Sequence, residues 1–206
     1  MTAPEHWQIR HLRLVVAALF VVLLGACSTV VRAPARKGAN TSHAGSVADG
    51  GGVSATSPDE ARAGYARVLQ RHVNDQGEVD FAALLNDVTD TGIGALESYV
   101  RAIAVTPLDA GLTRQARLAH MINGYNALST YNVIASNIPL SHHGFAKVQF
   151  FVLRKFVIGN TTMSLYDFEN GIIRKLGEPR VHFALNCSAV SCPALPRTVF
   201  TAGPFK

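Results

Sequence analysis

The residues of this sequence that are best suited to chemistry are two cysteines and a histidine near its C-terminal end. His182 precedes Cys187 by five residues, and Cys192 follows Cys187 by another five. A thiol activated by an imidazole base is the nucleophile of cysteine hydrolases, and a carboxylate or an amide usually orients the imidazole. With Glu169 or Asn123 in that third role, the set predicts a cysteine-dependent hydrolase or transferase as one candidate function.

The spacing of these residues leaves other interpretations open. On a regular strand, His182 and Cys187 have opposite parity and lie about 16 Å apart, at a rise of about 3.3 Å per residue. They can meet only if the chain turns sharply between them. Cys187 and Cys192 could instead form a disulfide, if their Cα atoms approach within about 7 Å, or remain as unreactive buried thiols. No second pair of Cys or His residues stands at zinc spacing, so we expect no metal and no cofactor.

The other polar candidates have structural alternatives as well. Glu169 falls at the apolar spacing of its segment, where a buried carboxylate must be paired or protonated. An ion pair with Arg174 or Arg180 is one outcome, and orientation of the imidazole is the other. Asn123 and Asn126 lie three residues apart on an expected helix. Their amides could satisfy backbone groups, or one could fix an imidazole tautomer or donate to an oxyanion.

The scaffold before residue 137 is expected to be mainly helical. Ser57 to Glu60 form a capping box with proline at the first helical position, and apolar residues then recur at helical spacing. Thr113 can cap a longer helix, which should stop before Ile138 and Pro139. Helices are therefore predicted over 58–73, 82–88, 94–104 and 114–136, with a very short strand at 79–81.

The second half predicts a small β-sheet. Residues 150–158 are rich in aromatic and β-branched side chains, and Gly159-Asn160 is a two-residue hairpin signal before a second strand at 161–164. A capped helix should follow Ser164 and stop at Gly177. Residues 181–185 alternate between apolar and polar side chains and predict a central strand. The fold class is therefore α+β.

The N-terminal end has the composition of an export signal. Arg10 and Arg13 precede Leu14 to Leu24, an unbroken apolar run of eleven residues. A membrane-spanning helix needs about 20 apolar residues, so this run suits a signal peptide over residues 1–26 better than an anchor helix. The following Cys27 completes Leu-Gly-Ala-Cys, which resembles the lipobox of bacterial lipoproteins. That resemblance implies acylation of the Cys27 thiol and cleavage just before it.

Residues 27–57 are expected to form a lipidated cysteine and a flexible tether. The segment from Ser28 to Ser57 contains five glycines and no aromatic residue, so it cannot bury enough apolar surface to offset its ordering entropy. Several acyl chains on one residue exceed the threshold for stable membrane anchoring. Serine rather than aspartate at position 28 implies, by the same resemblance, forwarding to the periplasmic face of the outer membrane.

Composition and charge argue against a nucleic-acid-binding protein. The 206 residues are 48% hydrophobic and 16% charged, in the range of globular proteins, and the length suits one domain with appendages. Residues 58–206 hold 14 basic and 12 acidic side chains, so most of the excess positive charge lies before the domain. The basic residues form no stripe with interleaved aromatics of the kind that follows a phosphate backbone.

Several ordered motifs lie at His120 to Leu128, Ser164 to Glu169, Ile172 to Arg174, Pro179 to Cys187 and Ser191 to Leu195. Together they resemble the domain-of-unknown-function 547 family, over roughly residues 60–197. That resemblance implies a domain found in bacterial envelope proteins and in plant proteins, without an established activity. It also implies further helical sequence after the cysteine segment, so the domain at 58–206 is expected to be incomplete at its C-terminal end.

The sequence therefore supports two functional hypotheses for an exported, lipid-anchored envelope protein. In the first, the domain is a binding module that meets an envelope protein or peptide, and its polar residues hold the core together. In the second, Cys187 and His182 perform thiol chemistry. The N-terminal lipid makes the membrane a partner in both.

Overall fold

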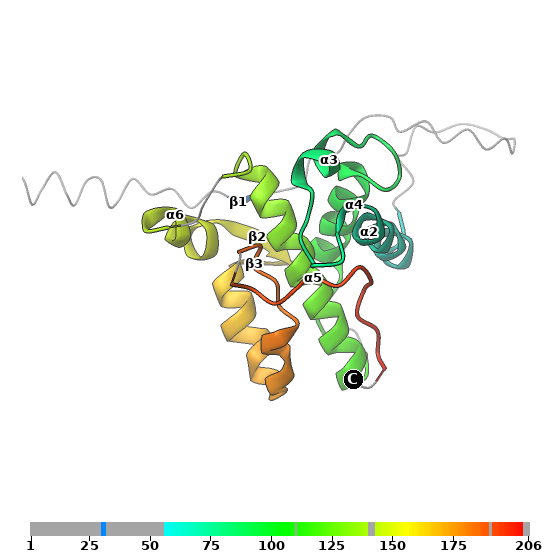
Figure 1. Ribbon diagram of the computed structural model, residues 1–206. Helices are drawn as coiled ribbons and strands as arrows, with labels where there is room; N and C mark the ends of the chain where they lie inside the picture. Colours follow the sequence, from blue (N-terminus) through cyan, green and yellow to red (C-terminus); the bar gives the residue numbers. More distant parts are fainter. Residues whose placement is uncertain (1–29, 32–55, 110, 140–142, 190, 204–206) are drawn as a thin grey trace, which may run out of the picture.

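The computed structural model describes residues 30–31, 56–109, 111–139, 143–189 and 191–203, and these residues form an α+β fold. Its larger part is a helical layer, and a small sheet and a run of short helical turns complete it (Figure 1). The predicted fold class is confirmed. The helices of the first part are α2 (Pro58–His72), α3 (Phe81–Asn86), α4 (Ile93–Val105) and α5 (Arg114–Ala135).

The four predicted helices of the first half are present, with ends close to those expected. Ser57 caps α2 by accepting a hydrogen bond from the Glu60 backbone N–H at 3.2 Å, and a proline stands in the first turn. Thr113 caps α5 in the same way through the Ala116 N–H. The short strand expected at 79–81 is reduced to a single bridge between Val73 and Val79, because Phe81 already begins α3.

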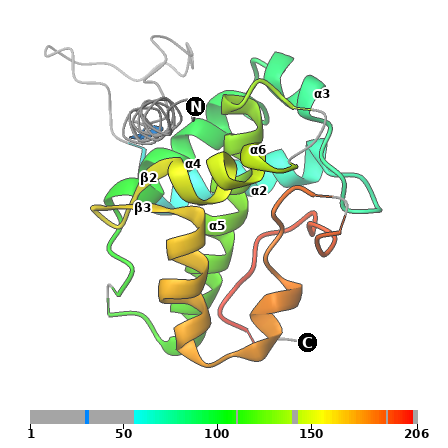
Figure 2. The same cartoon turned by 90° about the vertical axis from the view of Figure 1, so that its left-hand side faces the viewer.

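Helix α5 is the central element of the domain. Every residue from Met121 to Val133 is buried, so this part of the helix is covered on all sides. The views in Figures 1 and 2 agree that α4 lies along one side of α5 and the segment after β3 along another. A helix buried all round is normally apolar, but this one carries buried Asn123, Asn126 and Asn132.

The hairpin predicted in the second half is confirmed. Strands β2 (Lys155–Ile158) and β3 (Thr161–Ser164) pair antiparallel, with Phe156 opposite Met163. The turn residues Gly159 and Asn160 both have positive φ, 55° and 64°, as a two-residue hairpin of this type requires. A third, two-residue strand, β1 (Val30–Val31), pairs parallel with β2. The expected tether is therefore structured at these two residues.

The aromatic segment before the hairpin is strand only in its last four residues. Helix α6 (Phe145–Val148) continues directly into a π-helical turn, η1 (Gln149–Leu153). The buried Phe150 makes this a packed segment, and its backbone carbonyl accepts a hydrogen bond from the Asn132 side chain at 3.0 Å. Residues 150–153 are thus wound into a turn, and the prediction of strand there is wrong.

The predicted central strand at 181–185 is also wrong. Pro179–Phe183 form a 3₁₀ helix, η4, whose start is fixed by the Glu178 carboxylate accepting the Arg180 backbone N–H. Val181 and Leu185 are buried but Phe183 is 75% exposed. The buried positions therefore follow the helical spacing of three to four residues. The alternation of apolar and polar side chains along 181–185 had indicated the two-residue spacing of a strand instead.

The helix expected between Ser164 and Gly177 is present in a less regular form. It consists mainly of a π-helical segment, η2 (Asp167–Ile173), and a 3₁₀ turn, η3 (Arg174–Leu176). Gly177 ends it with a φ of 69°, the left-handed conformation that favours glycine. Within the described ranges, no helix combines the length and apolar composition that a membrane crossing requires.

Candidate functional site

The sequence-predicted site residues of the domain gather where the C-terminal segment crosses α5. Asn123 comes from α5, Glu169 from η2, His182 from η4, and Cys187 and Cys192 from the loop that follows. Cys27, the proposed lipidation site, lies outside the described residues. The segment after β3 runs beside α5 in both views (Figures 1 and 2), which brings residues about 60 positions apart into contact.

A chain of polar contacts connects α5 to His182. The Tyr125 hydroxyl donates to Glu169 Oε2 at 2.9 Å, and Glu169 Oε1 accepts from Arg174 Nη2 at 2.6 Å. Arg174 Nη2 in turn lies 3.2 Å from His182 Nδ1. Burial, then the charge of Glu169, raise the pKa of Tyr125 well above its ordinary value, so the phenol stays protonated as the donor.

This chain assigns His182 a different role from the one expected of a base. A guanidinium has only donors, so Nδ1 of His182 must be the acceptor and the ring hydrogen lies on Nε2. Arg174 therefore lies between Glu169 and the imidazole, and the carboxylate does not orient the ring directly. No hydrogen bond joins His182 to Cys187 among the described residues, so the structure does not assemble a nucleophile and base.

The two cysteines of the domain form a disulfide. Cys187 and Cys192 have Cα atoms 6.0 Å apart, and the Cys187 backbone N–H donates to Cys192 Sγ at 3.2 Å. Between them, Ser188 has a φ of 59°, which is uncommon for a residue with a side chain. The Asn186 side chain accepts the Ser188 N–H at 2.8 Å and supports this turn. A bonded sulfur is not a nucleophilic thiolate, so thiol chemistry at Cys187 would require prior reduction.

The buried asparagines of α5 all bind backbone. Asn123 donates to the Phe200 carbonyl at 2.9 Å and accepts the Phe200 N–H at 2.8 Å. Asn126 donates to the Ala184 carbonyl at 3.0 Å and accepts the Asn186 N–H at 2.8 Å. Each amide is thus used on both of its ends to hold an irregular stretch of the C-terminal segment. Both asparagines therefore satisfy backbone groups, which is the structural alternative that the sequence left open.

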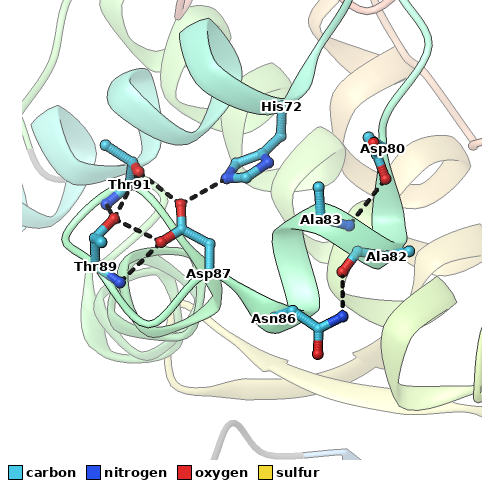
Figure 3. Close-up of polar contacts among 8 residues, drawn as sticks. All are labelled: His72, Asp80, Ala82, Ala83, Asn86, Asp87, Thr89 and Thr91. Carbon is cyan, nitrogen blue, oxygen red and sulfur yellow. Dashed lines mark hydrogen bonds and ion pairs between the residues drawn. The ribbon is translucent and has the colours of Figure 1, made fainter.

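Sequence reasoning missed a second polar cluster on the other side of the domain. His72, near the end of α2, places Nε2 3.0 Å from Asp87 Oδ2, and Figure 3 shows the two side chains pointing at one another. The Thr89 and Thr91 hydroxyls also donate to the Asp87 carboxylate, at 2.6 and 2.7 Å. These contacts hold the pKa of Asp87 well below its usual range, with the Thr89 hydrogen bond first among the causes.

This cluster borders an open cleft of about 720 Å³ between α2 and α3, lined among others by Arg71, Asn74 and Asn86. The sequence signal for this cluster was the pair of threonines two and four residues after Asp87. An aspartate at the start of a loop often accepts hydrogen bonds from the backbone and hydroxyls of the next few residues. The Asp87 carboxylate already has four donors, from the His72 ring, the Thr89 backbone and the Thr89 and Thr91 hydroxyls. The cluster therefore fastens the loop between α3 and α4 onto α2.

Neither cluster has the composition of a metal site. In the part of the chain that the structure describes, no group of three or more His, Cys, Asp or Glu side chains could hold a metal ion. The Glu178 carboxylate is paired with an arginine instead. Glu178 binds Arg180 through both carboxylate oxygens, at 2.7 and 2.9 Å, and this ion pair lowers the pKa of Glu178 to about 2.

Fold and site together define a helical α+β domain whose C-terminal segment is fastened by a disulfide and by buried asparagines. Comparison with protein families supports the resemblance seen in the motifs: residues 110–206 match the family described as a protein of unknown function, DUF547. The match begins near the start of α5 and includes every candidate residue of the domain from Asn123 to Cys192. Comparison with curated proteins and with solved structures gave no match.

Proposed function

We propose that this protein is a lipid-anchored cell-envelope protein whose domain acts as a binding module rather than as a thiol enzyme. The observation that carries the proposal is the disulfide between Cys187 and Cys192. The sequence has three cysteines, and the disulfide uses both of those outside the lipobox. Disulfides persist in oxidising compartments such as the periplasm, so the bond supports export and also removes the thiol that an enzyme would need.

The anchoring part of the proposal rests on the N-terminal residues. A charged start, a short apolar core, two small residues and Cys27 stand in the order of a lipoprotein signal. We propose that the protein is exported, acylated at Cys27, and held at the periplasmic face of the outer membrane because serine occupies position 28.

Replacing Cys27 with serine tests the anchor. In a Gram-negative host supplied with a palmitate label, the parent protein should be labelled and should fractionate with the outer membrane. Cys27→Ser should remain uncleaved and unlabelled. The matched control is Cys187→Ser with Cys192→Ser, which leaves Cys27 in place and should keep the label. Normal processing of Cys27→Ser would contradict the proposal, and Ser28→Asp should retain the protein at the inner membrane.

The proposed interaction surface is the exposed apolar face of α6 and η1. Phe145, Val148 and Val152 recur at helical spacing and are 70%, 44% and 39% exposed. A face of this kind on a surface helix indicates a binding site for another apolar surface. In Figure 1, α6 lies at the left-hand side of the domain near β2, and Figure 2 shows the same side facing the viewer.

We take the membrane as the occupant of this face, because of the direction of β1. Val30 pairs with Lys155 in a parallel ladder, so the N-terminal ends of β1 and β2 lie on the same side, and the residues before Lys155 lie on that side too. Those residues are Arg154 and η1. Cys27 stands three residues before Val30, a reach of at most about 11 Å. Acyl chains on Cys27 would therefore enter the bilayer next to this face.

Vesicle binding tests this surface. The mature chain from Ser28 onward, without lipid, should co-sediment with vesicles of phosphatidylethanolamine and phosphatidylglycerol. Phe145→Ser with Val148→Ser should weaken that binding. Val88→Ser, which changes an apolar residue that is 85% exposed on the loop after α3, is the control. Equal binding by all three proteins would contradict a membrane contact and favour an envelope protein or peptide as the partner.

A further inference from the structure

A small cavity lies among α2, α4 and α5, away from the disulfide loop. Its volume is about 200 Å³. An engineered apolar cavity of about 150 Å³ is large enough for benzene, so this space suits a molecule of one ring with a small substituent. Its apolar wall is formed by Ala102, Ile103, Leu112, Ala116 and Ala119.

Two of the residues that line this cavity each carry a buried polar atom without a partner among the described residues. The Tyr99 hydroxyl and His120 Nε2 have no hydrogen-bond partner among the described residues, although both are shielded from solvent. Tyr99 is 2% exposed, and its ring stacks on Tyr65 with centroids 4.9 Å apart. Buried polar groups in native proteins are normally paired, so an unpaired hydroxyl and imidazole beside one cavity indicate that a ligand supplies the partner.

Arg62 adds a positive charge to the same cavity. Burial lowers the pKa of His120, and the nearby Arg62 charge lowers it further, so the imidazole is kept neutral. The same charge opposes the rise that burial causes in the pKa of Tyr99. Arg62 contacts one carboxylate, Asp59, at 3.1 Å through Nη2, and that carboxylate is 90% exposed at the rim. The other guanidinium hydrogens remain for a second acceptor.

We propose that this cavity binds a small organic carboxylate. The apolar body of the ligand packs on Ile103 and Ala116, and its carboxylate accepts hydrogen bonds from Tyr99, His120 and Arg62. A carboxylate fits because all three groups can donate, and because it matches the charge of a guanidinium. This inference is independent of the lipid anchor and of the proposed membrane contact.

The test uses benzoate as the probe and the whole mature protein. Isothermal titration should show benzoate binding, and benzamide, which has the same shape without charge, should bind at least about tenfold more weakly. Tyr99→Phe should weaken benzoate binding about tenfold or more, the effect of losing one hydrogen bond to a charged group. Tyr65→Phe is the matched control, because its hydroxyl is also buried and unpaired but does not line the cavity. It should change the affinity less than about twofold.

Three results would overturn the proposal. They are no heat of binding at tens of millimolar benzoate, equal affinities for benzoate and benzamide, and equal weakening by Tyr99→Phe and Tyr65→Phe. If Tyr99→Phe does not fold, Ala116→Phe replaces it, since a ring at position 116 fills the cavity and should abolish benzoate binding. Unchanged binding in Ala116→Phe would contradict the site just as directly.

Discussion

The helices α2 to α5 and the later segment, residues 165–189 and 191–203, share one apolar core but differ in what holds their backbone. The helices pack apolar side chains such as Leu96, Ile103 and Ile122, all almost completely buried. The later segment is a succession of short π and 3₁₀ turns and coil, and polar side chains hold its backbone. A regular helix satisfies most of its own backbone groups, whereas irregular backbone needs partners from elsewhere.

The comparison explains why α5 carries buried asparagines. Each binds a stretch of irregular backbone: Asn123 at Phe200, Asn126 at Ala184 and Asn186, and Asn132 at Phe150. An asparagine side chain has a donor and an acceptor in the arrangement of a peptide group, so it can bind a backbone N–H and a C=O together. The C-terminal segment also packs apolar side chains such as Phe168, Val181 and Leu185 into the core. The conformation of its irregular backbone, however, depends on single asparagines of α5.

The largest effect is expected from Asn126→Ala. This change leaves the Ala184 carbonyl and the Asn186 N–H buried without partners, and each unsatisfied group costs about 1–3 kcal/mol. We expect the free energy of unfolding in urea to fall by about 3 kcal/mol. Asn86→Ala is the control, since Asn86 is exposed and binds only the Ala82 carbonyl of its own helix. It should cost less than about 0.5 kcal/mol.

A smaller effect is expected from opening the disulfide. Cys187 and Cys192 close a loop of only six residues, so the loss of chain constraint is about 2 kcal/mol. Cys187→Ser with Cys192→Ser should therefore lower the urea midpoint, and reduction of the parent protein should lower it by the same amount. If the urea midpoint does not move, the disulfide does not contribute to the stability of the domain. The contacts of Asn126 and Asn186 would then account for the order of this loop.

Low pH should act on the helical half through Asp87. The pKa of Asp87 is well below its usual range, mainly because Thr89 and Thr91 donate to the carboxylate. A carboxyl whose pKa is lowered by folding stabilises the protein above its unfolded pKa, about 3.9, and this contribution is lost as the pH falls further. The loss should reach about 1 kcal/mol by pH 3.

Asp87→Asn provides the comparison for this pH effect. The variant lacks the titrating group, so its free energy of unfolding should change less between pH 5 and pH 3 than that of the parent. Urea unfolding at several pH values measures both slopes. Identical slopes would mean that the contacts of Asp87 with His72, Thr89 and Thr91 do not stabilise the folded state.

The smallest effect is expected from Tyr65→Phe. The Tyr65 hydroxyl is buried and has no hydrogen-bond partner among the described residues, so its removal relieves a desolvation cost and leaves the apolar packing intact. The melting temperature should stay the same or rise, with a gain of at most about 1 kcal/mol. A clear loss of stability would show that the helical half also depends on polar contacts. The difference between the helices and the C-terminal segment would then be smaller than proposed.

The same contrast explains which parts of the fold the sequence could predict. Capping residues and apolar spacing predict the positions of α2 and α5 well, and Gly159-Asn160 predicts the hairpin. These signals depend only on residues that are close together in the sequence. The 181–185 segment was mistaken for a strand because Val181 and Leu185 fit either period. What decides its conformation is the Glu178 side chain at its start and the Asn126 side chain of α5 at its end, and the second is a long-range contact.

The sequence predicts which residues form the candidate site, but only some of the contacts between them. The sequence left a disulfide open for Cys187 and Cys192, and an ion pair to Arg174 open for Glu169, and both contacts are present. That Arg174 would reach His182, and that Asn123 would bind Phe200, depends on how the final segment returns along α5. The cluster of His72 and Asp87 went unnoticed because its members lie 15 residues apart on separate elements.

The central claim is that the C-terminal segment is a disulfide-closed structural element and not a thiol active site. Its most direct test is the thiol content of Cys187 and Cys192 in protein taken from the envelope under acid quench, with iodoacetamide labelling and peptide mass spectrometry before and after reduction. We predict a linked peptide pair and no labelling before reduction, followed by ordinary labelling rates afterwards. Rapid labelling of Cys187 at pH 6 without reduction would contradict the claim, because it would reveal an accessible thiolate with a lowered pKa.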